Sequence, residues 1–498
     1  MLEKIESINS AVNGFVWGIP VLSLLILTGV LMTILTKGFQ FSHVLHWAKN
    51  TIGSVFKKDV SGKNTDKASI SQFQALCTAL AATVGVGNIA GVATAIASGG
   101  PGAIFWMWIA AIFGTMTNYS ENVLGIYFRR KNVDGEWAGG AMYYLSSGVG
   151  GYKGMKQVGK VLAVLFAGFA ILASFGIGNA SQINTIAVNM ESAFSMSPYL
   201  TGVLLMVLAG LVIVGGIKRI ASVTEKVVPT MVVLYLIGAI VVVALNYDTI
   251  IASFESIFAF AFGFRALGGA AIGVAVKSAV TWGFKRGVFS NEAGLGSSVM
   301  VHSASNVKEP VRQGMWGIFE VVADTLVVCT LTALVILTSG AVDLTSGEML
   351  VDIEGSALVS NAFSGVFGSA GSAFIAIAIL LFAFSTVLGW SYYGTKAWEY
   401  LFGTKSTMIY KVVFVLFIFV GATMSLSLAW DISDTFNGLM ALPNLIGVVL
   451  LSPLVLKITK NYVQRNLKGE KVEPMLNNNA EIQAEQALAL AAETVETK

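Results

Sequence analysis

The chain carries little charge for its length. Asp, Glu, Lys and Arg make up only 12% of its 498 residues, whereas about 25% is usual in soluble globular proteins, and hydrophobic residues account for 55%. The net charge of +3 is also too small to indicate a nucleic-acid partner. This composition excludes an ordinary soluble domain and is typical of a protein that crosses a membrane several times.

Residues that carry enzyme or metal chemistry are equally scarce. The two cysteines, Cys77 and Cys329, lie in separate apolar segments without CxxC spacing, so we expect buried thiols and neither a disulfide nor a metal site. Of the three histidines, His43 and His46 have no further candidate ligands, and His302 lies at the inner end of an apolar segment, where we expect a capping role. Without a cluster of such groups beside a nucleophile, the sequence predicts no enzyme activity and no cofactor.

Proline is rare, at 8 residues, and glycine is abundant, at 53, which suits closely packed helices in a membrane. Windows of roughly 20 apolar residues predict about eleven membrane spans. Their approximate bounds are 15–36, 71–98, 101–128, 158–190, 198–216, 227–246, 270–302, 312–339, 365–401, 408–427 and 437–457.

The distribution of charge predicts the orientation of these spans. Lys and Arg are concentrated in the loops after the first and third spans, whereas residues 340–362 contain Asp and Glu without Lys or Arg. Another connection on the acidic side is expected to contain Asp431 and Asp434. Because positively charged loops stay in the cytoplasm, we expect a multi-pass protein of the cell membrane with its N-terminus outside and its C-terminus inside.

Two of the predicted spans contain runs that do not favour a continuous helix. The first run covers residues 81–91 and the second residues 283–296, and both are rich in glycine. Backbone groups freed inside a bilayer cost several kcal/mol each, so broken membrane helices occur mainly where they bind something. The sequence therefore predicts a carrier whose site lies near the middle of the membrane.

The spacing of the two interrupted spans predicts an inverted repeat. They are the second and seventh spans, and because they are five spans apart, two five-helix units must lie in opposite orientations. We expect an all-α fold with an N-terminal helix and basic loop (1–70), a first repeat (71–250), a second repeat (251–457) and a helical or disordered cytoplasmic tail (458–498).

The chemistry of the two interruptions suggests the ligand. Gly85, Gly87 and Gly91 allow the chain to leave and re-enter a helix near Asn88, where unpaired N–H groups would suit a carboxylate, although a glycine-lined packing groove is the alternative. Carbonyl and hydroxyl groups at 289–291 would suit an ammonium group or Na⁺. A carboxylate site that faces such a site fits the zwitterion of an amino acid.

Several polar residues in the predicted spans each have two interpretations. Ser385 and Thr386 could bind a cation or hydrogen-bond back to a preceding carbonyl. Glu292 could be functional or could form an ion pair with Lys285 and Arg286. The same choice between function and a structural ion pair applies to the other acids inside the spans, which are Glu121, Glu320 and Asp324.

Three segments closely resemble the alanine or glycine to cation symporter family of amino acid carriers. Residues 82–96 read ATVGVGNIAGVATAI, residues 139–144 read GGAMYY, and residues 286–297 read RGVFSNEAGLGS. The likeness extends over nearly the whole chain, from the first span to Pro453. It implies a leucine-transporter-like five-plus-five fold with two broken helices, coupling to Na⁺ or H⁺, and uptake of alanine, glycine or glutamine by alternating access.

The resemblance also implies roles for particular residues. Gly85, Gly87 and Asn88 match a substrate-cradling break, Gln182 matches a pocket position, and Phe289, Ala293 and Trp390 match residues that shape the side-chain pocket. The expected substrate-binding set is Thr83, Gly85, Gly87, Asn88, Gln182, Phe289, Ser290, Ala293 and Trp390. Likeness to the wider fold adds a sodium site formed by Ala81 and Val84 carbonyls and by the hydroxyls of Ser385 and Thr386.

One segment departs from the family pattern. Where an alanine-rich run with proline before the histidine is expected, residues 297–302 read SSVMVH, which should affect gating more than the class of ligand. A carrier of the same fold for another small solute, such as a nucleobase or an osmolyte, is the alternative function, and only the three matching segments argue against it. The sequence does not identify the preferred amino acid or the oligomeric state.

Overall fold

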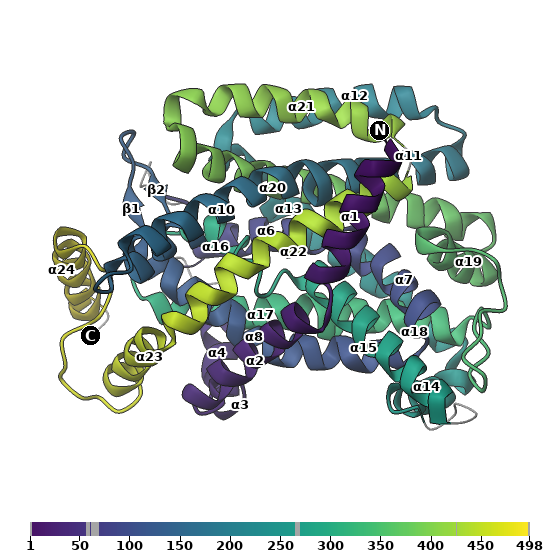
Figure 1. Cartoon of the computed structure of the whole chain (residues 1–498), viewed down its shortest axis with the longest axis horizontal. Helices are drawn as coiled ribbons and strands as arrows, with labels where there is room; N and C mark the ends of the chain where they lie inside the picture. Colours follow the sequence, from purple (N-terminus) through teal and green to yellow (C-terminus); the bar gives the residue numbers. More distant parts are fainter. Residues whose placement is uncertain (1, 56–59, 61–68, 264–268, 425, 497–498) are drawn as a thin grey trace.

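The computed structural model describes residues 2–55, 60, 69–263, 269–424 and 426–496, with backbone only for 2–6, 269–272, 426–432 and 493–496. Most of the lysines of the predicted first basic loop, Lys57, Lys58, Lys63 and Lys67, lie outside the described residues. The described chain is almost entirely helical (Figure 1). Its one β-hairpin pairs β1 (Arg130–Lys131) with β2 (Trp137–Ala138) in antiparallel fashion.

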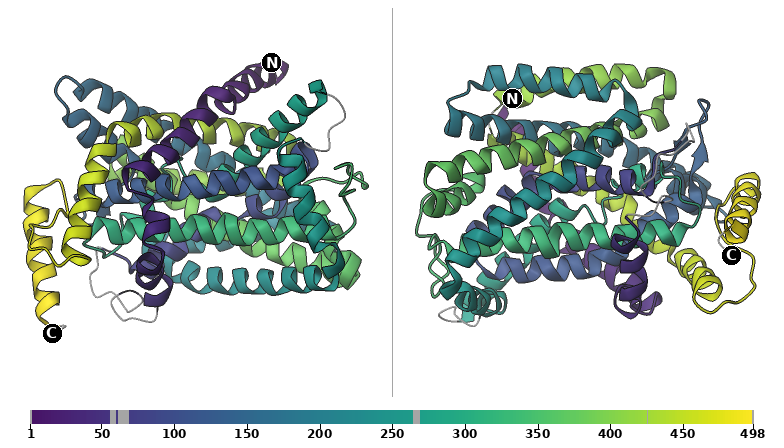
Figure 2. Two further views of the ribbon diagram at one scale, coloured as in Figure 1. Left: turned by 90° about the horizontal axis from the view of Figure 1, so that it is seen from below. Right: turned by 180° about the vertical axis from the view of Figure 1, so that it is seen from behind.

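Many of the long helices run roughly along the longest axis of the molecule, whereas α1 (Leu2–Val16) and α22 (Leu426–Leu450) cross it obliquely (Figure 1 and Figure 2). In the N-terminal part the long helices are α1, α2 (Ile19–Leu35), α8 (Gly102–Phe128), α10 (Lys156–Phe175), α11 (Ser181–Phe194), α12 (Pro198–Ile213) and α13 (Gly216–Leu245). In the C-terminal part they are α15 (Gly269–Asn291), the continuous segment of α17 (Pro310–Val321), η7 (Val322–Cys329) and α18 (Thr330–Thr338), α20 (Ser369–Phe402), α21 (Thr407–Thr423), α22 and α23 (Ser452–Asn466). Shorter helices α3 (Phe39–Ser42), α4 (Val44–Asn50), α14 (Ile250–Ala261) and α19 (Gly355–Phe367) lie at the ends of the bundle.

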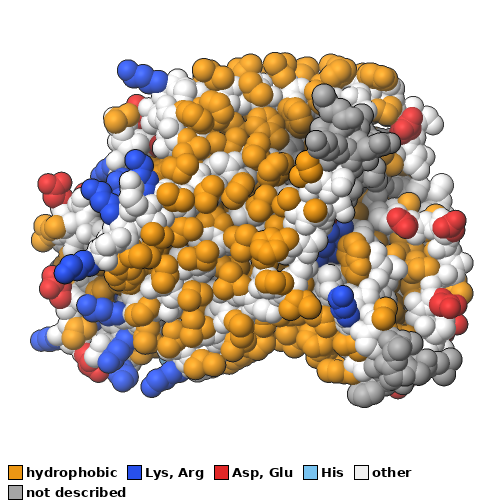
Figure 3. All heavy atoms as spheres, viewed as in Figure 1, with side chains coloured by type: hydrophobic (Ala, Val, Ile, Leu, Met, Phe, Trp, Pro, Cys, Tyr) orange, Lys and Arg blue, Asp and Glu red, His pale blue; other side chains and the backbone are white. Residues whose placement is uncertain are grey.

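Six helical segments of the described residues are long and apolar enough to cross a membrane, and a seventh is added if the bent pair Ser433–Leu450 and Ser452–Asn466 is one span. Of the other expected spans, residues 72–99 are interrupted and α12 has only 16 residues, whereas α8 is a continuous helix of 27 residues that is not among these six. The number of about eleven spans therefore stays a prediction. Apolar side chains cover most of the face in Figure 3, with Lys and Arg concentrated at the end that carries α23 and α24 (Ala480–Glu496).

The first interrupted helix consists of α6 (Gln72–Thr83), a short turn η2 (Val86–Asn88) and α7 (Ala90–Gly99). Its start is fixed by a capping box, in which Gln74 N donates to Ser71 Oγ and Ser71 N donates to Gln74 Oε1, both at 3.1 Å. Its interruption falls on the glycine-rich segment of the sequence.

The second interruption is shorter than predicted. The sequence predicts a break over 283–296, but α15 stays helical to Asn291 and the chain leaves the helix only at 292–298, before α16 (Val299–His302). Glu292, Gly294 and Gly296 have positive φ values of 57°, 92° and 72°, which end the helix. Gly283 does not interrupt the helix. It allows α15 to pack closely against α8, because a Cβ there would collide with the Ala103 carbonyl of α8.

A second correction concerns Asp434, which the sequence places with Asp431 in a connection. Both belong to α22, and the Asp434 side chain is buried. Lys285 Nζ lies 2.6 Å from Asp434 Oδ2, and Arg286 Nη1 lies 3.3 Å from Asp434 Oδ1. Asp434 can lie inside the helix bundle because Lys285 and Arg286 of α15 compensate its charge there.

The tail after α23 folds back on the bundle. The Asn478 amide donates to the Tyr127 carbonyl at 2.8 Å, and Asn477 Nδ2 donates to the carbonyls of Ile126 and Arg129. These bonds satisfy carbonyl groups at the C-terminal end of α8 that have no partner within the helix. The tail thus caps a central helix, because α8 packs against α15 and α17.

Candidate substrate and sodium site

The two interrupted helices meet at Gly87. A Cβ atom on Gly87 would lie 3.2 Å from Ser290 Cα and 3.3 Å from Phe289 Cδ1. The backbone of the first interruption therefore approaches the last turn of α15 so closely that a side chain at this position would require Phe289 and Ser290 to shift. This junction brings together three of the predicted substrate-binding residues from the two halves of the chain.

Gly85 lies on the other side of the same interruption. A Cβ there would collide with Thr386 Oγ1 and lie 3.1 Å from Gln182 Oε1. The amide of Val86 donates to Gln182 Oε1 at 3.1 Å, and the amide of Gly85 donates to Asn88 Oδ1 at 2.9 Å. Side-chain amide oxygens from α11 and from η2 thus occupy the N–H groups that the interruption frees.

The predicted sodium residues also come together. Thr386 Oγ1 donates to the Ala81 carbonyl at 2.9 Å and lies 3.1 Å from the Phe382 carbonyl, while Ser385 Oγ lies 3.4 Å from the Ala81 carbonyl. Ser385 bonds more closely to Phe382, at 2.8 Å, so both hydroxyls also make the back-bonds of an ordinary helix. Val84 ends α6 with ψ of 85°, which turns its carbonyl away from the helix axis.

Two of the predicted substrate-binding residues make their contacts elsewhere. Thr83 Oγ1 donates to the Ala79 carbonyl of its own helix at 3.3 Å. The Ala293 methyl packs with Ala111 and Val321 of α8 and α17. Neither contact lies at the junction of the interruptions.

Trp390 is fully buried and donates from Nε1 to Glu292 Oε1 at 2.8 Å. The second Glu292 oxygen accepts from Ser297 Oγ at 2.5 Å. Of the two alternatives for Glu292, the ion pair with Lys285 and Arg286 is not formed, because both cations contact Asp434. The positive φ of Glu292 turns its side chain away from the α15 face that carries the cations.

Asp324 is the residue that the expected site omits. Its helix contains a π-helical segment, η7 (Val322–Cys329), and its carboxylate is fully buried. Asn88 Nδ2 donates to Oδ1 at 2.6 Å, and Ser290 Oγ donates to Oδ2 at 2.8 Å. The sequence marks Asp324 as a charge in an apolar span, but the convergence of three distant segments on it is not visible there.

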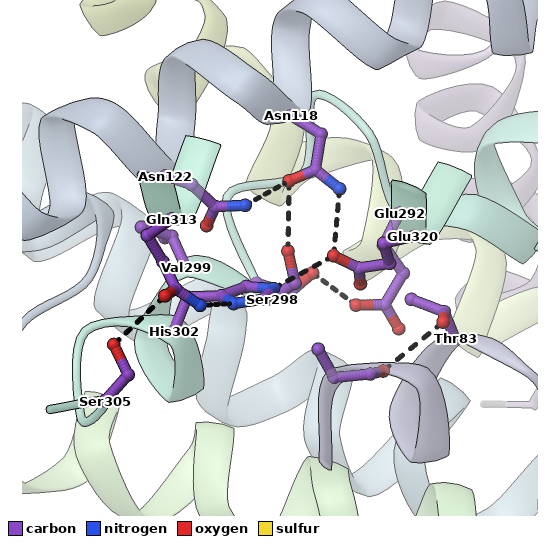
Figure 4. Close-up of polar contacts among 12 residues, drawn as sticks. Thr83, Asn118, Asn122, Glu292, Ser298, Val299, His302, Ser305, Gln313 and Glu320 are labelled. Atoms are coloured by element: carbon purple, nitrogen blue, oxygen red, sulfur yellow. Dashed lines mark hydrogen bonds and ion pairs between the residues drawn. The ribbon is translucent and has the colours of Figure 1, made fainter. Parts of the chain in front are cut away.

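A second buried network lies next to Glu292 (Figure 4). Glu320 Oε2 accepts from Asn118 Nδ2 at 3.2 Å and lies 3.1 Å from His302 Nε2, while Gln313 Nε2 bonds to His302 Nδ1. Because the Gln313 amide occupies Nδ1 as a donor, the imidazole proton sits on Nε2 and faces Glu320. His302 is thus a member of a buried network and not the predicted helix cap.

The fold of the chain is that of a known class of transporters. The structure is similar to that of MhsT in complex with L-phenylalanine, with a TM-score of 0.52 and 15% sequence identity over 79% of this chain and 99% of that chain. The all-α chain therefore has the leucine-transporter-like five-plus-five fold of membrane carriers with two broken helices.

The chain belongs to the sodium:alanine symporter family, whose model matches residues 2–476. It is 46% identical to the sodium/alanine symporter AgcS of Methanococcus maripaludis over 462 residues, which cover 92% of this chain and 98% of that protein. It is 36% identical to the probable sodium/glutamine symporter GlnT of Bacillus subtilis over 472 residues, which cover 94% and 93% of the two chains. The resemblance found in the sequence is confirmed, and the family is one of transporters.

Proposed function

We propose that the chain is a secondary active symporter that takes up a small neutral amino acid together with Na⁺ by alternating access. Alanine and glycine are the first candidate substrates and glutamine the next, since relatives are named for alanine and for glutamine. H⁺ is the alternative coupling ion. The observation that carries the proposal is the junction of the interrupted helices at Gly85 and Gly87, where backbone N–H groups and two side chains from other helices converge.

The substrate carboxylate would take the amides of Gly85 and Val86, which now donate to neutral amide oxygens of Asn88 and Gln182. The side chain of the amino acid would lie toward Phe289, because this ring packs against Gly87. A pocket bounded in this way favours a methyl group over longer side chains. Thr83, Ala293 and Trp390 complete the proposed set, although their present contacts lie outside the junction.

The coupling Na⁺ would bind next to Gly85, between the two helices that contribute Ala81, Val84, Ser385 and Thr386. Carbonyl and hydroxyl oxygens are the hard ligands that this cation prefers. Because Thr386 Oγ1 lies against Gly85, ion and substrate carboxylate would be neighbours. Such proximity links the two affinities through direct attraction of opposite charges.

We further propose that the carrier lies in the cell membrane with its N-terminus outside, its C-terminus inside and its two repeats over 71–250 and 251–457. The gathering of Lys and Arg at the end that carries α23 and α24 supports this orientation (Figure 3). A same-fold carrier of a nucleobase or osmolyte is not favoured, because the whole chain matches the sodium:alanine symporter family.

Thermal stabilisation of the purified protein tests the proposal. A ligand that binds only the folded state raises the denaturation midpoint, so alanine or glycine should raise it in Na⁺ and much less in choline. Nucleobases and betaine should have no effect. Stabilisation by a nucleobase or by betaine, and not by any amino acid, would contradict the proposed substrate class.

A further inference from the structure

Several buried carboxylates of the described residues contact a basic side chain. These pairs are Asp434 with Lys285 and Arg286, Glu309 with Arg465, and Glu399 with Lys396. Asp324 is just as buried, yet its described partners are all neutral, namely Asn88, Ser290 and Thr325. A buried carboxylate held only by neutral groups favours the arrival of a positive charge.

Three other buried acids, Glu121, Glu292 and Glu320, also have only neutral described partners, but their positions differ. Glu121 is bonded to Asn444 of α22, Glu292 to Trp390 and Ser297, and Glu320 to Asn118 and the neutral ring of His302. Only Asp324 of these four contacts the proposed substrate residues of both interrupted helices, Asn88 in the first and Ser290 in the second.

The side chain of Asn88 occupies the space between the two ends of the proposed site. Its Oδ1 accepts from the Gly85 amide at 2.9 Å, and its Nδ2 donates to Asp324 Oδ1 at 2.6 Å. An amino acid presents the same polarity, with acceptor oxygens at one end and N–H donors at the other. In this structure, Asn88 therefore makes the two bonds that the carboxylate and ammonium groups of a substrate would make.

The surroundings of Asp324 suit an ammonium group better than a second Na⁺. Asn88 turns its nitrogen toward the carboxylate, and the sulfur of Cys329 lies 3.3 Å from Ser290 Oγ and 3.4 Å from Asn88 Nδ2. An alkali cation would need several hard oxygen ligands, whereas an ammonium group needs only hydrogen-bond acceptors.

We propose that Asp324 binds the ammonium group of the transported amino acid, which rests on the proposed symport function. Together with Na⁺ beside Gly85, the zwitterion then leaves the loaded site with no net charge. On this proposal Asp324 selects solutes that carry an amino group beside a carboxylate, and carboxylates without an amino group should be rejected.

The test uses the purified full-length protein with alanine and with lactate, which has a hydroxyl in place of the ammonium group. Wild-type protein should bind alanine in Na⁺ and bind lactate at least about a hundredfold more weakly, since a buried charge would lose its partner. Asp324→Asn should weaken alanine binding by about a hundredfold, to the level of lactate, while Na⁺ alone still stabilises the protein. Glu121→Gln, a second buried acid without contact to Asn88 or Ser290, should keep alanine binding within about threefold.

The outcomes separate this inference from the proposed function. If wild-type protein binds no amino acid, the symport proposal itself is wrong. If wild-type protein binds alanine and Asp324→Asn binds it within about threefold of wild type, the ammonium lies elsewhere. If Asp324→Asn is unstable, Asp324→Glu keeps the charge, and it should retain preference for alanine over lactate with weaker affinity. If Asp324→Asn and Asp324→Glu both lose alanine binding and are also no longer stabilised by Na⁺, Asp324 is needed for the folded structure and the inference is wrong.

Discussion

Thr386 Oγ1 lies 2.9 Å from the carbonyl oxygen of Ala81, and this contact joins α20 to the last turn of α6 beside the first interruption. Its neighbour Ser385 approaches the same carbonyl at 3.4 Å. Two hydroxyls and a carbonyl from separate helices thus face one another directly next to Gly85. The hydroxyls can keep donating to the Phe382 carbonyl while their lone pairs bind a cation, which would enter between them and the Ala81 carbonyl.

Replacing both hydroxyls should weaken binding of Na⁺. In Ser385→Ala with Thr386→Val, we expect the Na⁺ concentration for half-maximal uptake to rise by about tenfold or more, because oxygen ligands worth roughly 1–3 kcal/mol are lost. Uptake of labelled alanine as a function of Na⁺ measures this change. The control is Ser391→Ala with Thr395→Val in the same helix, whose hydroxyls bond only to Leu388 and Ser391 carbonyls. If both double variants showed the same Na⁺ dependence, Ser385 and Thr386 would not be sodium ligands, and their hydroxyls would serve only as hydrogen-bond donors to carbonyls.

A large side chain at Gly87 should block the substrate site. Gly87→Leu would push against Phe289 and Ser290 and block access to the amides of Gly85 and Val86, so alanine binding should be abolished while membrane insertion continues. The matched control is Gly168→Leu in α10, where no atom lies within 4 Å of the added Cβ. Membrane abundance, thermal stability and alanine binding are compared for the two variants. Retained alanine binding in a stable Gly87→Leu protein would show that the site is not at this junction.

A smaller residue at Phe289 should widen the choice of substrates. Because its ring packs against Gly87, Phe289→Ala should admit longer side chains and weaken alanine affinity by roughly 1–3 kcal/mol. Competition of alanine uptake by a series of neutral amino acids measures the change. Trp390→Phe is the comparison, since it removes the bond to Glu292 but leaves a large ring. An unaltered competition series in Phe289→Ala would place the wall of the pocket elsewhere.

The orientation of the chain can be tested at two exposed loops. Val133, between β1 and β2, and Ser346, in the acidic connection before α19, are both exposed. In a protein without its two buried cysteines, Val133→Cys should be labelled only from the cytoplasmic side and Ser346→Cys only from outside. Labelling of both positions from one side would contradict the proposed orientation and the inverted repeat.

The first interruption could be predicted from sequence because its glycines have one role. Gly85 and Gly87 lie where side chains from other helices leave no room, and the helix ends there. The second could be predicted only in part, because Gly283 permits close packing against α8 while Gly294 and Gly296 permit positive φ. A sequence shows the glycine but not whether the neighbouring helix or the local backbone requires it.

The partners of the buried charged residues could not be predicted from the sequence either. Lys285 and Arg286 are close to Glu292 in the chain, yet they pair with Asp434, about 150 residues away, because Glu292 lies beyond the end of α15 with a positive φ. Asp324 meets Asn88 and Ser290 only after three helices are packed. Local patterns thus identify polar residues in apolar spans, whereas their pairing depends on tertiary structure.

Uptake of labelled alanine into proteoliposomes under an imposed Na⁺ gradient tests the central claim most directly. With purified wild-type protein, we predict accumulation of alanine above its external concentration when Na⁺ is higher outside, and only slow equilibration when Na⁺ is equal on both sides or replaced by choline. Collapse of the gradient with a Na⁺ ionophore should release the accumulated alanine. Equal uptake with and without the Na⁺ gradient, at equal pH on both sides, would contradict sodium-coupled symport.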